Sequence, residues 1–277
     1  MSTTYQSILF QQRAWADKQG IRLDKNGYTF SLNHNLYLPL SPQTIEEYSG
    51  GRGNELGNAA KRGKMQAVHS SSALVVNVFE YWRQAGKSSD IALLCGGSPN
   101  INSMGFERKF PTPAGRIPPH LDVELEGGRA RPMAVESKFN ECYLRKTKRK
   151  IKDKYIYNEK LWKGLSGCEE LAQMIRLEEQ GKTSFAYLDV PQLIKHILGL
   201  YTKYGDKGFE IVYLWYYVPS VEASKHRAEI ESFKSYIKDE AGFRDMTYQD
   251  LFEKIKRCNG IDGRYVAYLA ERYFPLP

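Results

Sequence analysis

The 277-residue sequence predicts an α/β fold in which helices flank a mixed sheet. Three observations predict it. Two short segments near the middle of the chain alternate apolar and polar residues, which is typical of half-buried strands. The later segment FEIVYLWYYV is apolar almost throughout, as expected for a strand that is buried on both faces. Apolar stripes at helical spacing lie before and after these segments.

Helices are predicted before the strands. Residues 1–20 place apolar side chains roughly on one face, whereas residues 21–54 are rich in Asn, Pro, Gly and Tyr and are expected to be irregular. A short helix is expected to begin at Glu55, with the preceding asparagine as its N-cap. A longer helix begins at the serines 70–72, carries an apolar stripe and stops near Gly86.

Three consecutive antiparallel strands are predicted next, in the segments GFERKFPTP, HLDVELEGG and RPMAVESKF. Proline and glycine residues separate them, and the pair Gly127–Gly128 opens the turn from the second strand into the third. A long polar stretch follows, from Asn140 to about Gly181.

After this stretch a helix is predicted from Pro191, because proline suits the first helical turn. The buried strand comes next, and three amphipathic helices close the chain, at about 221–239, 247–258 and 262–273. A chain of this length fits one domain with elaborations. We therefore expect a single domain, 1–277, with a core at about 55–218, a helical N-terminal extension (1–54) and added C-terminal helices (219–277).

The composition is that of a soluble globular protein, with 42% hydrophobic and 26% charged residues. Four cysteines without regular spacing are expected to be free thiols in a reducing compartment, and the scattered histidines offer no zinc-ligand spacing. The beginning of the chain does not resemble a signal peptide, and no apolar run is long enough to cross a bilayer. We therefore expect a cytoplasmic protein without a membrane partner. Its net charge of +8 and pI near 9.1 favour a polyanionic partner.

One face of the predicted hairpin carries charged side chains. Because side chains along a strand point alternately to opposite faces, Asp122 shares a face with Glu124. Glu136 and Lys138 share a face of the next strand for the same reason. A bend centred on Arg129 would place Asp122 directly opposite Glu136, and a tighter turn would set the two acids on a diagonal.

Two facing carboxylates repel each other unless a cation lies between them, and their hard oxygens suit Mg²⁺ or Mn²⁺. Such an ion binds a phosphodiester oxygen, lowers the pKa of a bound water and stabilises the charge that builds on phosphorus. Asp122 and Glu136 are therefore candidate catalytic metal ligands. The ammonium group of Lys138 would orient the attacking water or stabilise the transition state. The alternative is that all three side chains form the solvated face of an ordinary hairpin.

Asp122 and the sequence Glu136-Ser137-Lys138 resemble the motif of the PD-(D/E)XK nuclease superfamily. This resemblance implies a restriction-endonuclease-like core: a helix, a three-stranded antiparallel meander, a helix and a strand, here at roughly residues 55–218. Pro119-His120-Leu121 stands before the first acid in place of a lone proline, a mild departure because the proline is often absent from this superfamily. The beginning and the end of the chain also resemble a prokaryotic branch of the superfamily.

The resemblance implies further site residues. Family members often carry an acid on the helix before the meander that completes the metal shell; Glu55 or Glu80 would serve, and Glu55 is the preferred third metal ligand. An exposed glutamate favoured by the helix dipole is the alternative for Glu55. The helix after the third strand lines the cleft in the superfamily, which makes Gln192 a candidate catalytic residue, or else a capping residue, and Lys195 a candidate nucleic-acid contact. His196 is expected to be a packing or surface residue.

The segment 145–154 holds seven basic residues in ten, with tyrosines and Trp162 around it. Basic charge interleaved with aromatic rings suits phosphate neutralisation and base stacking. A solvated lysine-rich surface is the alternative. The candidate nucleic-acid-binding residues are Arg145, Lys146, Lys148, Arg149, Lys150, Lys152 and, from the following helix, Lys195.

Together these features predict Mg²⁺- or Mn²⁺-dependent hydrolysis of phosphodiester bonds in DNA by an endonuclease of the PD-(D/E)XK type. RNA stays an alternative substrate, and cutting both strands would favour a homodimer. The second hypothesis is a catalytically silent DNA-binding module on the same fold, whose binding weakens steeply with salt. A structural or interaction protein with a basic loop is the third.

Overall fold

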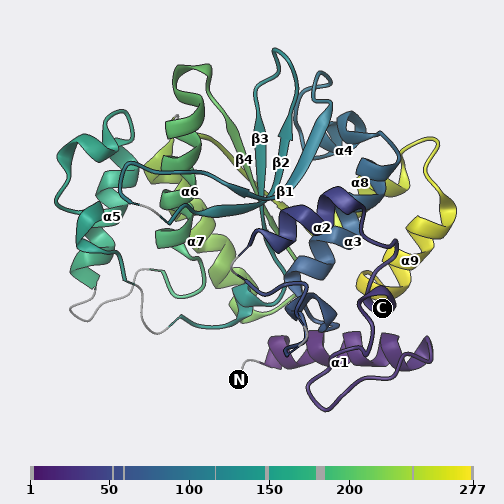
Figure 1. The fold of residues 1–277 in the computed structure, drawn as a ribbon. Coiled ribbons are helices and arrows are strands. Elements are labelled where there is room, and N and C mark those ends of the chain that lie inside the picture. The colour runs from purple at the N-terminus through teal and green to yellow at the C-terminus, as the bar shows by residue number, and fades with distance from the viewer. Residues whose placement is uncertain are drawn as a thin grey trace.

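A mixed sheet of five strands runs through the described part of the chain (Figure 1). The computed structural model describes residues 3–275, apart from 52, 59, 116, 147–149, 179–184 and 239. The strands, in their order across the sheet, are β1 (Ser103–Lys109), β2 (His120–Glu126), β3 (Met133–Lys138), β4 (Glu210–Trp215) and β5 (Gly242–Thr247). β2 is antiparallel to β1 and β3, whereas β4 runs parallel to β3 and to β5. The predicted α/β class with a mixed sheet is therefore confirmed.

The register between β2 and β3 follows the first of the two predicted alternatives. Val123 pairs with Val135. The same register, continued by one residue, brings Asp122 opposite Glu136. The chain reverses where the backbone N–H of Ala130 donates to the carbonyl of Gly127 at 2.7 Å, and the intervening Gly128 has φ +38°. The glycine pair thus serves the turn, because a positive φ favours glycine.

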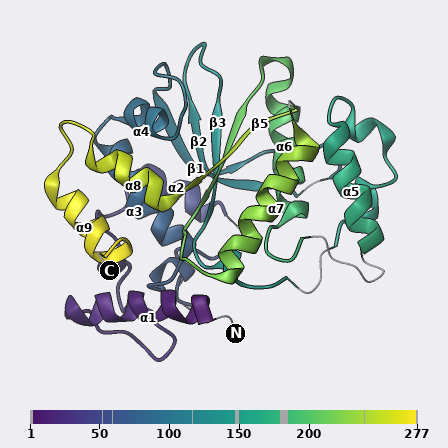
Figure 2. The ribbon, with the colours of Figure 1, turned by 180° about the vertical axis from the view of Figure 1, so that it is seen from behind.

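Helices cover both faces of the sheet (Figures 1 and 2). One face is covered by α5, α6 and α7, and the other by α3, α4, α8 and α9, while α2 packs against β1 and α1 against α9. The described helices are α1 (Thr3–Lys18), α2 (Pro42–Ser49), α3 (Ser71–Gln84), α4 (Ser88–Leu94), α5 (Ser166–Glu178), α6 (Val190–Tyr204), α7 (Val221–Ile237), α8 (Tyr248–Lys256) and α9 (Gly263–Tyr273). None of these described helices is long and apolar enough to cross a membrane.

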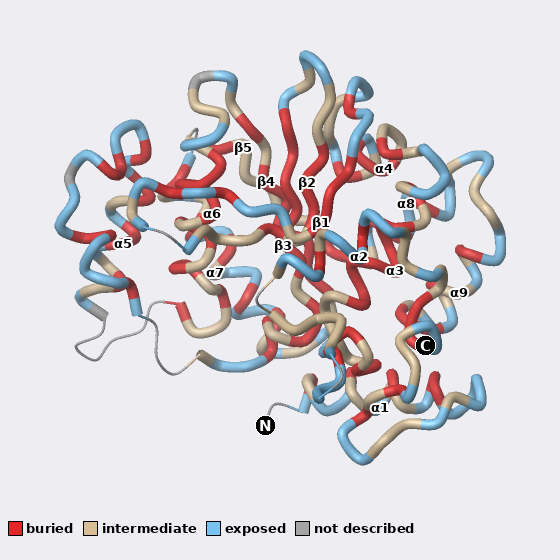
Figure 3. Tube along the Cα trace, in the orientation of Figure 1, coloured by how far each residue is buried: buried red, intermediate tan, exposed pale blue. Residues whose placement is uncertain are grey.

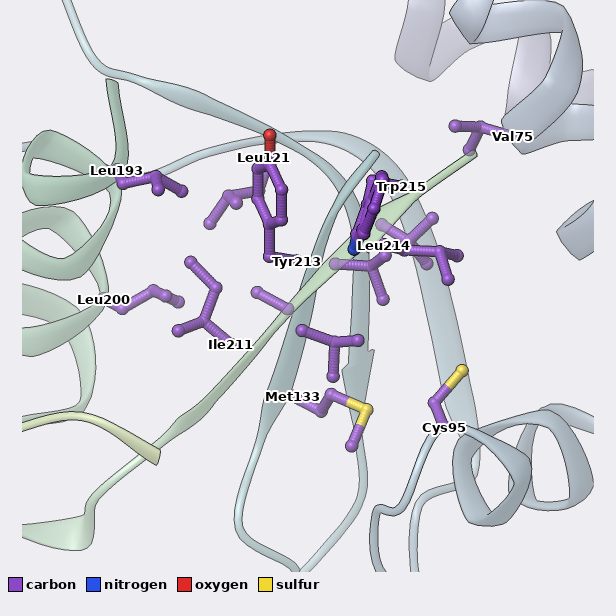
Figure 4. Packing of buried hydrophobic residues seen from close by; sticks show 14 of the residues in the cluster. Val75, Cys95, Leu121, Met133, Leu193, Leu200, Ile211, Tyr213, Leu214 and Trp215 are labelled. Carbon is purple, nitrogen blue, oxygen red and sulfur yellow. The ribbon is translucent and has the colours of Figure 1, made fainter. Parts of the chain in front are cut away.

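The sheet lies in the hydrophobic core, and its strands are largely buried (Figure 3). Leu193 and Leu200 of α6 pack from one side, and Val75 of α3 lies on the other (Figure 4). Full burial of one such side chain stabilises the fold by about 1.5–3 kcal/mol. Leu121 and Val123 of β2 are fully buried, so Asp122 between them must point to the opposite face, towards α6. All four cysteines are free, as expected.

Two elements differ from the sequence prediction. β5 lies within 219–277, where only helices were expected, and its sequence GFRDMT has no regular alternation. It forms because its backbone pairs with β4 at the edge of the sheet, a tertiary contact that local pattern does not encode. α5 lies in the stretch from 140 to 181 that was expected to be polar and without a helix. It buries Leu171, Ala172 and Ile175, which follow helical spacing.

No helix begins at Glu55, so that prediction was wrong. Its chain segment instead forms a bend whose backbone pairs with the chain ahead of α3: the N–H of Met65 donates to the carbonyl of Glu55 at 3.0 Å. Gly57 has φ +79° and forms an isolated bridge with Arg62, which stops a helix from starting. The region before it also contains more regular structure than expected. Ser41 caps α2 by accepting from the N–H of Thr44 at 3.3 Å.

Candidate functional site

Asp122, Glu136 and Lys138 come together on the α6 face of the sheet. The backbone N–H of Ser137 donates to Oδ2 of Asp122 at 2.7 Å, which ties the side chain of β2 to the backbone of β3. Lys138 Nζ donates to Oε1 of Glu136 and, at 3.0 Å, to Oε1 of Gln192 on α6. Glu136 is only 2% exposed. The sequence-predicted acid pair and lysine therefore form one contiguous polar cluster.

The cluster has an unusual charge balance. Burial raises the pKa of Asp122 well above its usual range, and the negative charge of Glu136 raises it further. Lys138 and the Ser137 N–H act in the opposite direction without cancelling these effects. Burial on its own lowers the pKa of Lys138, but the carboxylates around it outweigh burial and the net shift is upward. Two carboxylates thus repel each other beside a firmly protonated lysine.

Helix α6 covers this cluster with its first two turns. Asp189 caps the helix by accepting from the backbone N–H of Gln192 at 3.1 Å, so the capping role belongs to Asp189 and the Gln192 side chain is left to hold Lys138. His196 Nδ1 lies 3.3 Å from Oε2 of Glu136. Burial lowers the pKa of His196 to about 4, so the ring is neutral near pH 7. Of the two alternatives predicted for His196, packing or surface, the structure shows a buried residue, and it is buried against the site.

Glu107 on β1 is a site residue that the sequence analysis missed. The pairs Phe106–Val123 and Arg108–Leu121 flank it, so it lies across from Asp122. Its backbone has φ +48°, a strained conformation for a residue with a side chain. Its carboxylate lies 3.2 Å from Nδ1 of His120. Three acids thus follow one line across β1, β2 and β3.

The surroundings of Glu107 also connect it to the cluster. Burial raises the pKa of Glu107, the hydrogen bond from His120 opposes this, and the charges of Glu55 and Glu136 raise it further. The charged residues at 107 and 109 had no visible pattern of their own. One signal could have identified Glu107. The predicted strand before the one that carries Asp122 also has an acidic residue near its middle.

Of the two candidates for a third metal ligand, Glu80 belongs elsewhere. Glu80 accepts from Thr44 Oγ1 at 2.7 Å and pairs with Arg83, so it ties α3 to α2. Glu55 accepts from Ser72 Oγ at 2.9 Å and lies 3.6 Å from Lys64 Nζ. Its charge reaches Glu107, yet a hydroxyl group and an ammonium group already occupy its oxygens.

The carboxylate oxygens of Asp122 and Glu136 are suitable ligands for a divalent cation. Among the residues that the structure describes, no group of three or more His, Cys, Asp or Glu side chains is arranged to hold a metal ion. Glu55 is therefore not grouped with Asp122 and Glu136. The two acids on β2 and β3 still offer adjacent hard oxygens, and a cation would relieve the repulsion that raises the pKa of Asp122. Water molecules can complete a magnesium shell that has only two protein carboxylates.

The basic residues divide into three groups. Lys150, Lys152 and Lys195 line a cleft of about 320 Å³ that also includes Gln192 and His196. Lys146 pairs with Asp189, the cap of α6, and Arg145 is exposed. Lys148 and Arg149 lie outside the described residues.

A mixed sheet with paired acids and a lysine two residues further along β3 places the chain in the restriction-endonuclease-like class. The family model of REase-ARP, described as restriction endonuclease associating with ARP, matches residues 10–274. The chain belongs to this family. The resemblance to the PD-(D/E)XK superfamily is thereby confirmed. No curated protein and no solved structure matches the chain.

Proposed function

We propose that this protein is a divalent-metal-dependent nuclease that hydrolyses phosphodiester bonds in DNA. The observation that carries the proposal is the cluster on β2 and β3: Asp122 across from Glu136, with the ammonium group of Lys138 between Glu136 and Gln192. Membership of a restriction endonuclease family supports a nuclease-type function and DNA as the substrate. Cleavage itself, its dependence on Mg²⁺ or Mn²⁺ and its endonucleolytic character are parts of the proposal.

In this proposal Asp122 and Glu136 hold the cation. A bound Mg²⁺ or Mn²⁺ supplies a water of lowered pKa and positive charge for the transition state. Lys138 keeps its proton at neutral pH, because its pKa is raised, and therefore acts as a donor of charge and hydrogen bonds and not as a base. Gln192 holds the ammonium group from the α6 side, and the neutral His196 fills the space behind Glu136.

The basic residues near the cluster supply the contacts to the nucleic acid. Lys150, Lys152 and Lys195 reach the same cleft as Gln192, so a phosphate backbone that enters there passes beside the acids. We propose the exposed Arg145 as a further contact, and Lys148 and Arg149, which lie outside the described residues, are proposed as contacts from the sequence alone. A second copy of the chain would cut the second strand of a duplex, which is why we expect a homodimer for double-strand cleavage.

The proposal is tested by nicking of supercoiled plasmid DNA with Mg²⁺ or Mn²⁺. Wild type is compared with Asp122→Ala and Lys138→Ala. Glu126→Ala, which changes another acid of β2, and Lys207→Ala, which removes an exposed lysine, are the matched controls. We expect nicking by wild type and both controls and a loss of at least about 100-fold in the two site variants. Activity that survives both site substitutions excludes this site.

One observation favours a second function, a DNA-binding module without catalysis. Both oxygens of Glu136 already face Lys138 and His196, and no three-ligand group occurs in the described chain. This alternative predicts DNA binding that weakens steeply with salt, unchanged by divalent ions and with no cleavage. The plasmid assay, together with binding measured over a series of salt concentrations, separates the two.

A further inference from the structure

The cleft beside the acidic cluster combines three separate parts of the chain. Residues 117–120, which lead into β2 and include its first residue, form one wall, residues 150–155 form a second, and the first turns of α6 form the third. Gln192 and His196 belong both to this cleft and to the surroundings of Lys138 and Glu136. The cleft therefore opens directly beside the proposed point of cleavage.

Four lysines line this cleft, which we call the lysine cleft: Lys150, Lys152, Lys154 and Lys195. Elsewhere in the protein, lysines such as Lys203 and Lys234 pair with carboxylates. No ion pair to a described carboxylate is formed by any of the four. Four neighbouring ammonium groups repel one another, and an anion in the cleft would relieve this repulsion.

Lys195 is the most deeply placed of the four. It projects from α6 and is only partly exposed, whereas the three lysines of 150–154 are at the surface. Burial lowers the pKa of Lys195, the charge of Asp189 opposes this, and the charges of Lys152 and Lys154 lower it further, so the three amines are close enough to interact. The less exposed Lys195 therefore distinguishes this cleft from a fully solvated lysine-rich face.

The lysine cleft also has apolar side chains, in the segment that leads into β2 and at Tyr155. Ile117 is 56% exposed, which is unusual for a large aliphatic side chain, and two prolines follow it. The ring of Tyr155 lies beneath the ammonium group of Lys154, 5.1 Å from ring centroid to Nζ. An inorganic anion needs only the lysines. A ligand with an anionic part and a flat or apolar part would contact both the lysines and the apolar side chains.

We propose that the lysine cleft binds one unpaired nucleotide of the substrate strand, next to the phosphodiester that is cut. Its phosphate contacts the lysines, and its sugar and base lie against Ile117 and the prolines. The volume of about 320 Å³ is at the lower end of the range for small-ligand pockets, which favours a single nucleotide over a base pair. This inference rests on the proposed function, and it assigns the substrate: nucleic acid with at least one unpaired nucleotide beside the cut.

The test measures the binding of a fluorescein-labelled 15-nucleotide DNA strand by anisotropy, in EDTA so that no cleavage occurs. The pocket variants are Lys195→Gln, the double variant Lys152→Gln/Lys154→Gln and Ile117→Ser. Lys207→Gln changes an exposed lysine in the short helix Gly205–Lys207, just past the opposite end of α6, and is the matched control. Both lysine variants are expected to weaken binding about tenfold, with a salt slope smaller by about one for each lysine removed.

Two further comparisons assign the ligand. Wild type is expected to bind the single strand at least about fivefold more tightly than a fully paired duplex of the same sequence, and Ile117→Ser is expected to reduce this preference. Deoxyadenosine 5′-monophosphate is expected to displace the labelled strand at lower concentration than inorganic phosphate or deoxyadenosine. Pocket variants that bind like Lys207→Gln would overturn the proposal. Competition by inorganic phosphate that equals the nucleotide would overturn it as well.

The failure of this inference and the failure of the proposed function are distinguishable with Lys138→Ala. This variant is expected to bind the single strand like wild type and to lose plasmid nicking. If wild type does not cut but the pocket variants still lose binding, the nuclease proposal fails and the nucleotide site stands. If wild type cuts and the pocket variants bind and cut normally, the nucleotide site fails alone.

Discussion

Asp122 and Glu124 lie two residues apart on the same face of β2, but their surroundings differ in charge. Glu124 accepts from Arg108 Nε at 2.8 Å and also from Lys203 and Tyr204. Burial alone would raise the pKa of Glu124, but these donors outweigh it and the net shift is downward. Asp122 accepts from one backbone N–H and otherwise faces Glu136 and Glu107, and its pKa is raised.

This difference separates a structural carboxylate from a functional one. Both acids follow the same alternation and both lie on the face of the sheet that α6 covers, so strand position does not distinguish them. The cations of β1 and α6 neutralise Glu124 within the protein. At Asp122 the positive charge of Lys138 does not cancel the effects of burial and of the neighbouring carboxylates, and a carboxylate that is kept in such an unfavourable charge environment is typical of a functional site.

The largest expected effect is on catalysis. Asp122→Asn keeps the shape of the side chain and can still accept from the Ser137 N–H, but it removes the charge that holds a cation. We expect the single-turnover cleavage rate to fall at least about 100-fold, against less than about threefold for Glu124→Gln. Equal losses in the two variants would show that the contrast between the acids has no bearing on the reaction.

The next effect is on the binding of metal ions. Ca²⁺ or Mn²⁺ is expected to stabilise wild type against thermal unfolding, by about 2.7 kcal/mol when the ion is at 100 times its dissociation constant. Glu124→Gln should retain this stabilisation, and Asp122→Asn should lose most of it. Differential scanning calorimetry with and without EDTA measures both. Stabilisation that persists in Asp122→Asn would place the cation elsewhere.

Stability without metal should show the opposite order. Glu124→Gln leaves Arg108 without its carboxylate and Lys203 with Glu126 alone, so we expect the free energy of unfolding to fall by about 1–3 kcal/mol. Asp122→Asn removes a carboxylate whose ionised form is disfavoured in the folded state, so at pH 7 the free energy of unfolding should rise. Urea unfolding in EDTA tests this. A loss of stability in Asp122→Asn would contradict the charge repulsion that we assign to the site.

The sequence predicted the part of this comparison that depends on local pattern, apart from the choice between two registers. Alternation on two strands and a glycine turn place Asp122 opposite Glu136, and both features are local. Whether an acid is neutralised depends on residues far away in the chain: Lys203, on a helix that follows a long connection, decides the state of Glu124. Such pairings come from tertiary packing, so the sequence did not distinguish the two carboxylates.

Glu107 and β5 are two further features that local sequence pattern does not predict. Glu107 lies on a strand that was predicted, but its positive φ interrupts the regular geometry from which side-chain direction is predicted. β5 has little strand character in its sequence and exists because β4 offers a free edge. The helix α5, in contrast, carries a readable apolar spacing and was missed because the charged residues that precede it make the whole stretch from 140 to 181 look polar.

The smallest expected effect is at Gln192, which holds Lys138 but touches neither carboxylate in any described contact. Gln192→Ala leaves Lys138 its contact with Glu136 and removes one neutral acceptor, so we expect kcat to fall about three- to tenfold. KM should be unchanged, and Gln192→Glu, which keeps an acceptor oxygen, should restore most of the rate. A change in KM alone would assign Gln192 to substrate binding instead of to the positioning of Lys138.

A crystal structure of the protein soaked with Mn²⁺ tests the central claim most directly, because the anomalous signal locates the ion without reference to activity. The account predicts one strong peak within about 2.5 Å of carboxylate oxygens from both Asp122 and Glu136, and no peak at Glu124. A crystal in which the two acids keep their present contacts and manganese binds elsewhere, or not at all, would contradict it.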